Sequence, residues 1–292
     1  MCAVLDFNLY KKSANYSSVN GHQIAHWSAG KGEAILLIHG FPSAAWDWHF
    51  MWPKLKASYR LFTLDLLGYG LSDKPFPHQY SLLEQADIIE SLLEKECIQQ
   101  CHIIAHDYGN SVAQELLRRQ YKNKLSFGIK SLCFLNGGLF SEAHRPLLTQ
   151  KLLKGPLGGI VSKLMTKRKL NKSFTKIFGP DTPPKAEEID ILWQLMNENN
   201  GKRVLHDLLS YIDERKRHRD AWVEAMQNVS IPLRFINGVH DPISGQHMLG
   251  RYKELIPNAD AHALNLGHYP QIEGPEQVLE LYQAFLNENR DS

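Results

Sequence analysis

Short apolar runs and helical patterns alternate along most of the chain. The runs that predict β-strands cover residues 22–28, 34–38, 59–65, 101–105, 130–135, 233–237 and 261–266. Apolar positions recur at helical spacing over residues 81–94, 110–121 and 275–286. Short apolar strands that alternate with helices are typical of a mostly parallel sheet covered on both faces. The predicted fold class is therefore α/β.

One long segment, residues 140–222, interrupts this alternation. Its pattern is helical and contains no good strand. We therefore predict a core formed by residues 1–139 and 223–292, with residues 140–222 inserted as a helical cap. The Pro-rich patch at residues 179–184 is expected to be a loop within that cap.

The composition is that of a large globular protein, with 292 residues, 43% hydrophobic residues and a formal net charge of +2. This net charge gives no overall attraction to nucleic acid, so no nucleic-acid partner is expected. The four cysteines are too few and too irregular for a disulfide framework. We find neither a start typical of a signal peptide nor a run of about 18 apolar residues. A soluble cytoplasmic protein is expected.

The charges are unevenly distributed. Residues 140–222 hold 16 Lys or Arg and 10 Asp or Glu, and the rest of the chain holds 17 and 21, so the cap is about +6 and the core about −4. Residues 151–176 carry eight basic and no acidic residues among apolar ones, and the basic run 215–219 adds to them. This pattern fits a solvated outer face of the cap. It also fits a basic amphipathic surface that contacts an anionic membrane or attracts an acidic substrate.

The chemistry centres on Ala105-His106-Asp107-Tyr108-Gly109, between a predicted strand and a predicted helix. This layout is that of a nucleophile elbow, whose sharp turn needs small residues two positions before and after its centre. An Asp after a strand often only caps a helix, but the small residues at both positions favour a nucleophile. Asp107 would attack an electrophilic carbon and form an ester without first losing a proton. The expected substrate is therefore a small apolar electrophile, an epoxide or a carbon–halogen compound.

Two further residues complete a candidate catalytic triad. Asp241 follows the predicted strand 233–237, and His268 follows the last predicted strand. Parallel strands end at one edge of the sheet, where α/β proteins bind ligands, so both are expected to lie near Asp107. His268 would activate water to hydrolyse the ester, and Asp241 would orient His268. Asn136 ends the preceding strand, but an amide lacks the charge of an acid, so Asp241 is preferred.

The backbone N–H groups of Phe41 and Tyr108 are expected to bind the developing oxyanion or leaving group. Trp46 and Trp48 are expected to line an apolar pocket beneath the cap. No metal site is predicted, because no His, Asp or Glu grouping has zinc-ligand spacing. No cofactor is predicted either, because residues 68–70 lack the third glycine of a dinucleotide fingerprint.

Stretches that resemble a known family span nearly the whole chain: 39–42, Trp46 with Trp48, 65–75, 106–110, 132–140, 240–242 and 268–270. They resemble the α/β-hydrolase fold in the branch of epoxide hydrolases and haloalkane dehalogenases. Within this branch the chain most resembles the group of mesoderm-specific transcript proteins. The resemblance implies a cofactor-independent hydrolase with a catalytic triad, a covalent intermediate and a cap.

Departures from these relatives bear on the substrate. Resemblance to haloalkane dehalogenases would imply a Trp beside the nucleophile and often an Asn after His-Gly, where this chain has Tyr108 and Phe41. Phe41 matches epoxide hydrolases, which use two cap tyrosines as proton donors, whereas residues 140–222 contain only Tyr211. Tyr211 is expected either to donate a proton, alone or beside a group such as Trp193, or only to pack. We expect an epoxide hydrolase-like enzyme. The alternatives are a dehalogenase-like hydrolase and a non-catalytic protein that binds a membrane or a partner.

Overall fold

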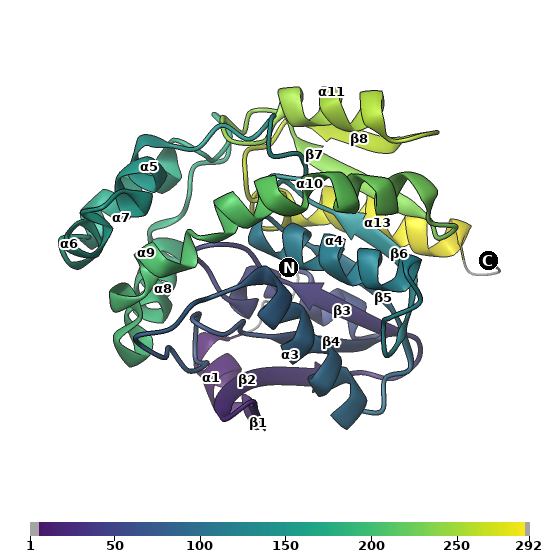
Figure 1. The fold of residues 1–292 in the computed structure, drawn as a ribbon, viewed down its shortest axis with the longest axis horizontal. Helices are drawn as coiled ribbons and strands as arrows, with labels where there is room; N and C mark the ends of the chain where they lie inside the picture. Colours follow the sequence, from purple (N-terminus) through teal and green to yellow (C-terminus); the bar gives the residue numbers. More distant parts are fainter. Residues whose placement is uncertain (1–5, 290–292) are drawn as a thin grey trace.

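The computed structural model describes residues 6–289, which form a sheet covered by helices on both faces (Figure 1). The strands are β1 (Asn15–Val19), β2 (His22–Ala29), β3 (Ala34–Ile38), β4 (Arg60–Leu64), β5 (Gln100–Ala105), β6 (Gly128–Phe134), β7 (Leu233–Gly238) and β8 (Asp260–Leu264). Their order in the sheet is β1-β2-β4-β3-β5-β6-β7-β8. The pairs β1–β2 and β2–β4 are antiparallel, and the other neighbours are parallel. The predicted α/β class with a mostly parallel sheet is confirmed.

The central strands are apolar along their whole length because both of their faces are buried. Leu36 and Ile38 of β3 point into one core, and Ile35 and Leu37 point into the other. The first core is covered by α3 (Leu82–Lys95), α4 (Tyr108–Tyr121), α10 (Tyr211–Asn228) and α11 (Gln246–Leu255). The second is covered by α1 (Phe7–Lys12), η1 (Ala45–Trp48), α2 (Trp52–Leu55) and α13 (Pro275–Glu288). This two-sided burial explains why continuous apolar runs predicted these strands.

Local signals fix where several helices begin. The Ser81 side chain accepts a hydrogen bond from the Leu83 N–H and caps α3. Pro275 opens α13 and Pro270 opens α12 (Pro270–Glu273), at positions where a missing N–H costs nothing.

The edge strand β1 was not predicted, because most of its side chains are exposed and lack the apolar alternation of a half-buried strand.

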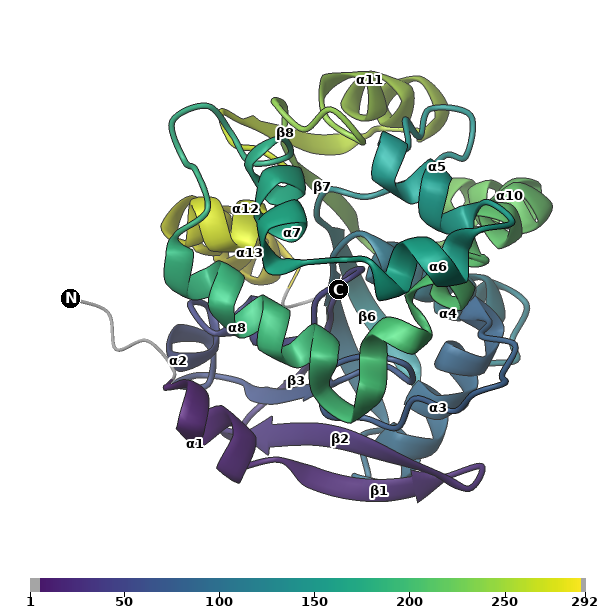
Figure 2. The same cartoon turned by 90° about the vertical axis from the view of Figure 1, so that its left-hand side faces the viewer.

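Between β6 and β7 the chain forms the cap helices, and Figure 2 looks onto them. They are α5 (Leu148–Lys154), α6 (Gly158–Lys163), α7 (Lys167–Thr175), α8 (Ala186–Asn197), η2 (Glu198–Arg203), α9 (Leu205–Leu208) and the start of α10. Helix α10 then continues without a break through residue 222, the predicted end of the cap, and runs along α4 (Figure 1). The last cap helix is therefore also a helix of the core.

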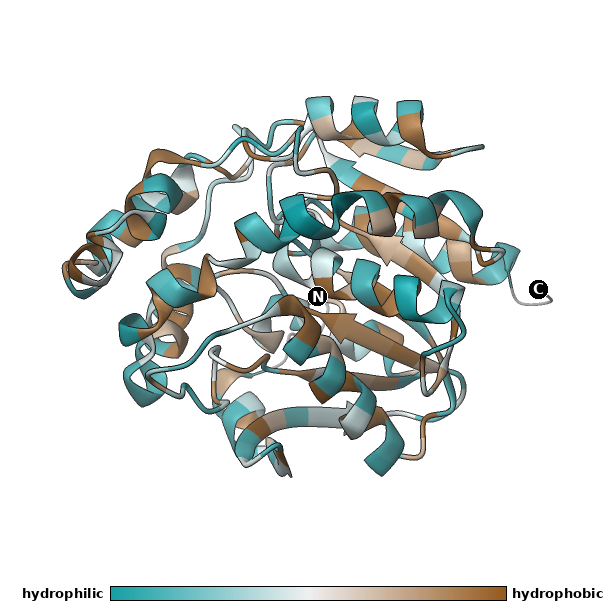
Figure 3. Cartoon of the chain, in the orientation of Figure 1, coloured by the Kyte–Doolittle hydropathy of each residue, from teal (hydrophilic) through white to brown (hydrophobic). Residues whose placement is uncertain are grey.

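Hydropathy follows this layered arrangement, since apolar residues fill the central strands and polar residues cover the outer sides of the core helices (Figure 3). None of the helices within residues 6–289 is both long and apolar enough to cross a bilayer. Cys97, Cys101 and Cys133 are free thiols, and Cys2 lies outside the described residues.

Candidate active site

Asp107 lies at the sharp turn between β5 and α4. Its backbone has φ 44° and ψ −103°, a strained conformation that non-glycine residues rarely adopt. Glycines surround the turn because the backbones approach closely. A Cβ atom on Gly109 would lie 2.4 Å from the Ile38 carbonyl oxygen, and one on Gly137 would lie 2.7 Å from the Asp107 Cα. This strand–turn–helix geometry is that of a nucleophile elbow.

The Asp107 carboxylate is buried and surrounded by donors. The Phe41 N–H donates to its Oδ2 at 3.1 Å, and Arg215 Nη2 lies 3.6 Å from its Oδ1. Burial by itself would raise the pKa of Asp107, but the charges of Arg215 and His268 outweigh burial and hold this pKa below its ordinary value. Asp107 is therefore an anion at neutral pH, which is the form that can attack carbon.

Asp241 and His268 come together at the ends of β7 and β8. His268 Nδ1 donates to Asp241 Oδ2 at 2.7 Å, and both side chains are buried. Burial opposes the charged imidazolium, but the Asp241 carboxylate outweighs it and raises the pKa of His268 to about 9. Burial likewise opposes the carboxylate, and the charge of His268 nevertheless lowers the pKa of Asp241 to about 2. The pair is held as an ion pair while Asp107 keeps its negative charge.

Asn136 supports this ion pair. Its Nδ2 donates to Asp241 Oδ2 at 3.1 Å and to the Gly238 backbone carbonyl at 2.9 Å. Its backbone carbonyl accepts from the Asp107 N–H at 2.8 Å. Asn136 was not the preferred acid, because an amide lacks charge. The structure gives it another task, since it joins the backbone of Asp107 to the side chain of Asp241.

His106 fixes the backbone of the triad histidine. Its Nε2 donates to the His268 carbonyl at 2.8 Å, so this nitrogen carries the proton. The other ring nitrogen, Nδ1, lies 3.8 Å from Asp47 Oδ2.

Arg215 is the main residue that sequence reasoning misplaced. It was grouped with the basic run 215–219 as part of an exposed or membrane-facing surface, and for Arg215 this prediction is wrong. The side chain is 2% exposed. Its Nη2 donates to the Asp107 carbonyl at 2.8 Å, and its Nε donates to Ser111 Oγ at 2.6 Å. The available signal was its position four residues after Tyr211, which places both side chains on one face of α10.

Aromatic rings surround the nucleophile. The Tyr211 ring centroid lies 5.0 Å from that of Tyr108 and 6.2 Å from that of Phe41. Tyr69, which the sequence analysis did not consider, lies 5.4 Å from Tyr108 and 6.4 Å from Phe41. The hydroxyls of Tyr69 and Tyr211 are buried and have no hydrogen-bond partner among the described residues. Burial raises the pKa of both phenols, so both remain protonated donors.

A narrow cavity of about 60 Å³ reaches this site from the cap. Phe41 and His268 line this cavity, whereas Asp107 does not line it and is bonded to the backbone N–H of Phe41. Its walls come mainly from apolar side chains of the cap: Leu147, Leu153, Met165, Leu170, Phe174 and Met196. Such walls favour a small apolar ligand.

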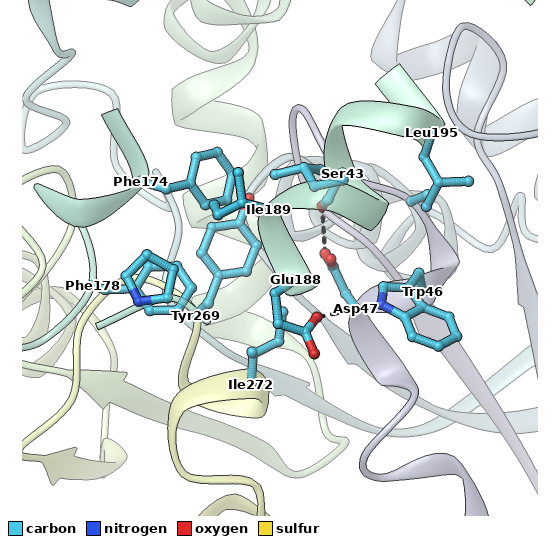
Figure 4. Close-up of a pocket in the computed structure, with 13 residues that line it drawn as sticks. Ser43, Trp46, Asp47, Phe174, Phe178, Glu188, Ile189, Leu195, Tyr269 and Ile272 are labelled. Carbon is cyan, nitrogen blue, oxygen red and sulfur yellow. Dashed lines mark hydrogen bonds between the residues drawn. The ribbon is translucent and has the colours of Figure 1, made fainter. Parts of the chain in front are cut away.

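The two predicted pocket tryptophans are separated. Trp46 lines a second, smaller cavity of about 20 Å³, whose lining also includes Phe174 and Tyr269 (Figure 4). Phe174 lines the first cavity as well. Trp46 Nε1 donates to Glu188 of the cap helix α8 at 3.4 Å. Trp48 instead lines a cavity near α1 and α2, so the structure does not place it beneath the cap. Lys202 Nζ lies over the ring of Trp193, 5.2 Å from its centroid.

Metal-ligating side chains come together at one place in the described part of the chain. His22, His78 and Glu84 bring their ligand atoms within 4.8 Å of one another. Their positions in the sequence follow no zinc-ligand spacing, and the three side chains are close together only in the folded chain. None of the three lines the two cavities beneath the cap.

Comparisons with known proteins agree with the fold. Over residues 33–275 the chain matches the alpha/beta hydrolase fold family. It is 42% identical to the mesoderm-specific transcript protein of Mus musculus, over 95% of this chain and 87% of that protein. It is also 38% identical to LipZ of Mycobacterium tuberculosis, over 88% of this chain and 89% of that protein.

Solved structures are similar in fold at low sequence identity. The epoxide hydrolase CorEH superposes with a TM-score of 0.79 at 19% identity, covering 94% of this chain and 98% of that one. The haloalkane dehalogenase DatA from Agrobacterium tumefaciens superposes with a TM-score of 0.79 at 20% identity, covering 94% and 96%. The fold is therefore shared by enzymes of both kinds, and the fold does not distinguish between their substrates.

Proposed function

This chain belongs to the alpha/beta hydrolase fold family, and from this premise we propose that it hydrolyses small apolar epoxides through a covalent ester to Asp107. The observation that carries the proposal is the buried, ionised carboxylate at the centre of the elbow, beside the Asp241–His268 ion pair. A carboxylate can attack carbon without a base, whereas a serine in this place would need one.

In the first step, a carboxylate oxygen of Asp107 attacks one ring carbon and the carbon–oxygen bond of the epoxide breaks. The ring oxygen takes the electron pair and accepts a proton from the Tyr211 hydroxyl. Tyr211 suits this task because its buried hydroxyl has no hydrogen-bond partner among the described residues and lies beside Phe41 and Tyr108. Tyr69 is the candidate for the second donor, supplied by the core instead of the cap.

In the second step, His268 takes a proton from water, and the resulting hydroxide attacks the ester carbonyl carbon. The Phe41 N–H holds Oδ2, where the oxyanion develops, and the Tyr108 N–H lies at the first turn of α4, where it has no helical partner. Collapse of this intermediate releases the diol and restores the carboxylate. The proton on His268 then returns to the Tyr211 phenolate, so the sum is epoxide plus water to diol.

Esterification also prepares the base. The negative charge of Asp107 contributes to the raised pKa of His268, and the ester has no such charge. The pKa of His268 therefore falls once the intermediate forms, which favours release of its proton to solvent and the neutral imidazole that can accept a proton from water. Arg215 has the opposite task, because it keeps Asp107 ionised before the attack.

The dehalogenase alternative keeps the same nucleophile and base but needs donors for a halide ion. Phe41 and Tyr108 occupy the positions where haloalkane dehalogenases usually carry Asn and Trp, so these positions offer no side-chain N–H. The free hydroxyls of Tyr211 and Tyr69 suit an alkoxide that must gain a proton. These contacts favour the epoxide as the substrate.

The test is to trap the ester. In a His268→Gln variant, attack by Asp107 should proceed and hydrolysis should stop, so intact-protein mass spectrometry should show one covalent adduct. Incubation with a styrene-type epoxide should add the full mass of the epoxide, and incubation with a short haloalkane would add the alkyl group alone. The adduct should map to Asp107 and be absent from the double variant that also carries Asp107→Asn.

Turnover by the unmodified protein distinguishes the alternatives. Diol formation without halide release supports the epoxide hydrolase proposal. Halide release from haloalkanes without diol formation would replace it with the dehalogenase. A panel of both substrate types that gives neither adduct nor product would leave the non-catalytic binding protein as the better interpretation.

A further inference from the structure

Large apolar side chains are exposed together on the outer side of the cap. Among the described residues, eight large apolar side chains are exposed, and five of these lie on α5, α6 and the turns beside them. The five, with their exposed fractions, are Leu148 (70%), Leu152 (51%), Leu157 (63%), Ile160 (57%) and Leu164 (61%). Figure 3 shows this end of the cap as an apolar tip that projects away from the sheet. We call these five residues the apolar tip.

The side chains around the apolar tip are basic. The stretch 151–176 contains no Asp or Glu, and its eight basic residues are all exposed: Lys151, Lys154, Lys163, Lys167, Arg168, Lys169, Lys172 and Lys176. Lys154 pairs with Asp213, and Lys167 pairs with Asp190. The other six form no ion pair with any described residue, so their charge is not neutralised by the protein itself.

The cap helices have two apolar sides with different surroundings. The inner side chains, such as Leu153, Met165 and Leu170, are buried and line the cavity that leads to His268. The outer side chains of the apolar tip contribute nothing to that cavity. A helix needs one apolar side to pack on its own protein, so the second side has no task within this chain.

We propose that the apolar tip and its basic surround dock on the surface of an anionic phospholipid bilayer. Apolar side chains would enter the boundary between headgroups and acyl chains, and the surrounding Lys and Arg would contact lipid phosphates. The charge of the rim favours this partner: Asp190 and Asp213 neutralise only two of its eight basic side chains, and the other six match a surface of uniform negative charge. Because no helix within residues 6–289 can cross a bilayer, these helices lie on the membrane surface.

Docking in this way brings the active site close to the lipid. Helix α5 contributes to both, because its Leu148 and Leu152 belong to the apolar tip and its Leu153 lines the cavity, so at α5 the tip and the cavity are one helix apart. An apolar substrate dissolved in the bilayer would then reach the cavity without crossing bulk water. This consequence rests on the proposed function, but the docking itself does not.

Vesicle flotation tests the docking. The protein should float with vesicles of phosphatidylcholine and phosphatidylserine and should remain unbound with phosphatidylcholine alone, and added salt should weaken binding. The variant Leu157→Ser/Ile160→Ser/Leu164→Ser should lower the partition coefficient by about tenfold or more, because it removes three apolar side chains that would be buried in the bilayer. The matched control is Leu9→Ser/Phe76→Ser, which removes exposed apolar side chains elsewhere and should bind as the unmodified protein does.

A second variant separates charge from burial. Lys163→Glu/Lys172→Glu removes two basic side chains that form no ion pair, and it should weaken binding to the anionic vesicles by about tenfold or more. Circular dichroism should show that all variants are folded. Hydrolysis of a water-soluble epoxide should be equal in all of them, so loss of docking is distinguishable from failure of the proposed function.

Three results would overturn the docking proposal. The first is no binding to anionic vesicles. The second is equal binding by the apolar-tip variant and the unmodified protein, which would mean that the basic residues adsorb nonspecifically. The third is a dimer in sedimentation experiments that the apolar-tip variant converts to a monomer, because the tip would then be covered by a second copy of this chain.

Discussion

The candidate triad at the strand ends and the helices between β6 and β7, which form the proposed cap, are held by different forces. Asp241 accepts five hydrogen bonds, including those from Asn136 and His268, and each fixes an oxygen in a given direction. The cap cavity is lined mainly by apolar side chains such as Leu153 and Met165. Apolar contacts are strong in sum but have no direction, so many sets of side chains could fill the same space.

This difference means that the two regions affect different properties of the site: its chemistry and its choice of ligand. Hydrogen-bonded charges tolerate few substitutions, because an unpaired buried charge is costly. They therefore restrict the site to one kind of chemistry. The apolar walls restrict only the size and polarity of the ligand, so under the proposed function changes in the cap would alter the substrate while the core kept its mechanism. Variants in the two regions should accordingly differ in magnitude and in kind.

The largest effect is expected from Asp241→Asn. Without this carboxylate, His268 loses its orientation and its counter-charge, and kcat for epoxide hydrolysis should fall by about four orders of magnitude. The pKa of His268, which Asp241 raises to about 9, should fall by about two pH units, as measured by NMR titration of the imidazole. Asp260→Asn, which changes a carboxylate on β8 away from the site, should leave kcat unchanged. An unaltered His268 pKa would contradict the assigned ion pair.

The same ion pair should make stability depend on pH. The pKa of His268 in the folded protein lies above its ordinary value of 6.5. Its contribution is therefore fully present below about pH 6.5 and is lost as the pH rises through about 9. Urea unfolding of the unmodified protein should show this decline, and Asp241→Asn should flatten it. A decline of equal size in the variant would point to other groups.

The next largest effect is expected from Arg215→Met, at the point where the cap helix meets the core. Removing the guanidinium should lower kcat/KM by about 100-fold near neutral pH, because Asp107 loses the charge that keeps it ionised. The pKa of Asp107 rises, so the acid limb of the pH–rate profile should shift to higher pH. The protein should also lose about 3–5 kcal/mol of unfolding free energy. Arg217→Met, which changes an exposed arginine on the same helix, should have neither effect.

Smaller effects are expected from the tyrosines. Tyr211→Phe should slow formation of the ester by about 100-fold, and Tyr69→Phe by about tenfold, in single-turnover measurements. Neither hydroxyl has a hydrogen-bond partner among the described residues, so unfolding free energy should change by less than about 0.5 kcal/mol. Ester formation at an unchanged rate in Tyr211→Phe would leave Tyr211 as a packing residue.

The smallest effect on catalysis is expected in the cap. Leu153→Ala enlarges the cavity and should shift the kcat/KM ratio of a longer to a shorter epoxide by about tenfold. Leu116→Ala in α4 is the control. Both variants should lower the unfolding free energy by about 2–5 kcal/mol, but Leu116→Ala should leave that ratio unchanged. An equal shift in both variants would mean that selectivity follows stability and not the cap wall.

Much of the core could be predicted from the sequence. The strand 34–38 was predicted with the bounds that the structure gives it, because its apolar run is buried on both faces. The strands before Asp107, Asp241 and His268 were predicted as well, so the rule that parallel strands end at one edge sufficed to group the three. Their catalytic roles remain predictions.

Contacts between distant segments could not be predicted. Arg215 lies in a run of basic residues, and nothing in that run marks the one side chain that turns inward to Asp107. Trp46 and Trp48 are two residues apart yet line different cavities, because the turn of η1 directs them to different sides. Tyr69 and Tyr211 both pack near the rings of Tyr108 and Phe41, although they come from a core loop and a cap helix more than 100 residues apart in the chain.

The sequence by itself determined the α/β class, the inserted helical segment and the carboxylate at the centre of the elbow. These features are local, since apolar periodicity and small residues around one turn are read over a few neighbouring positions. Only the tertiary structure decided that Arg215 pairs with Asp107, that Asn136 supports Asp241, and that the cap turns its second apolar side outward. Such outcomes depend on which surfaces meet when the helices pack, and apolar packing has no direction that a sequence pattern records.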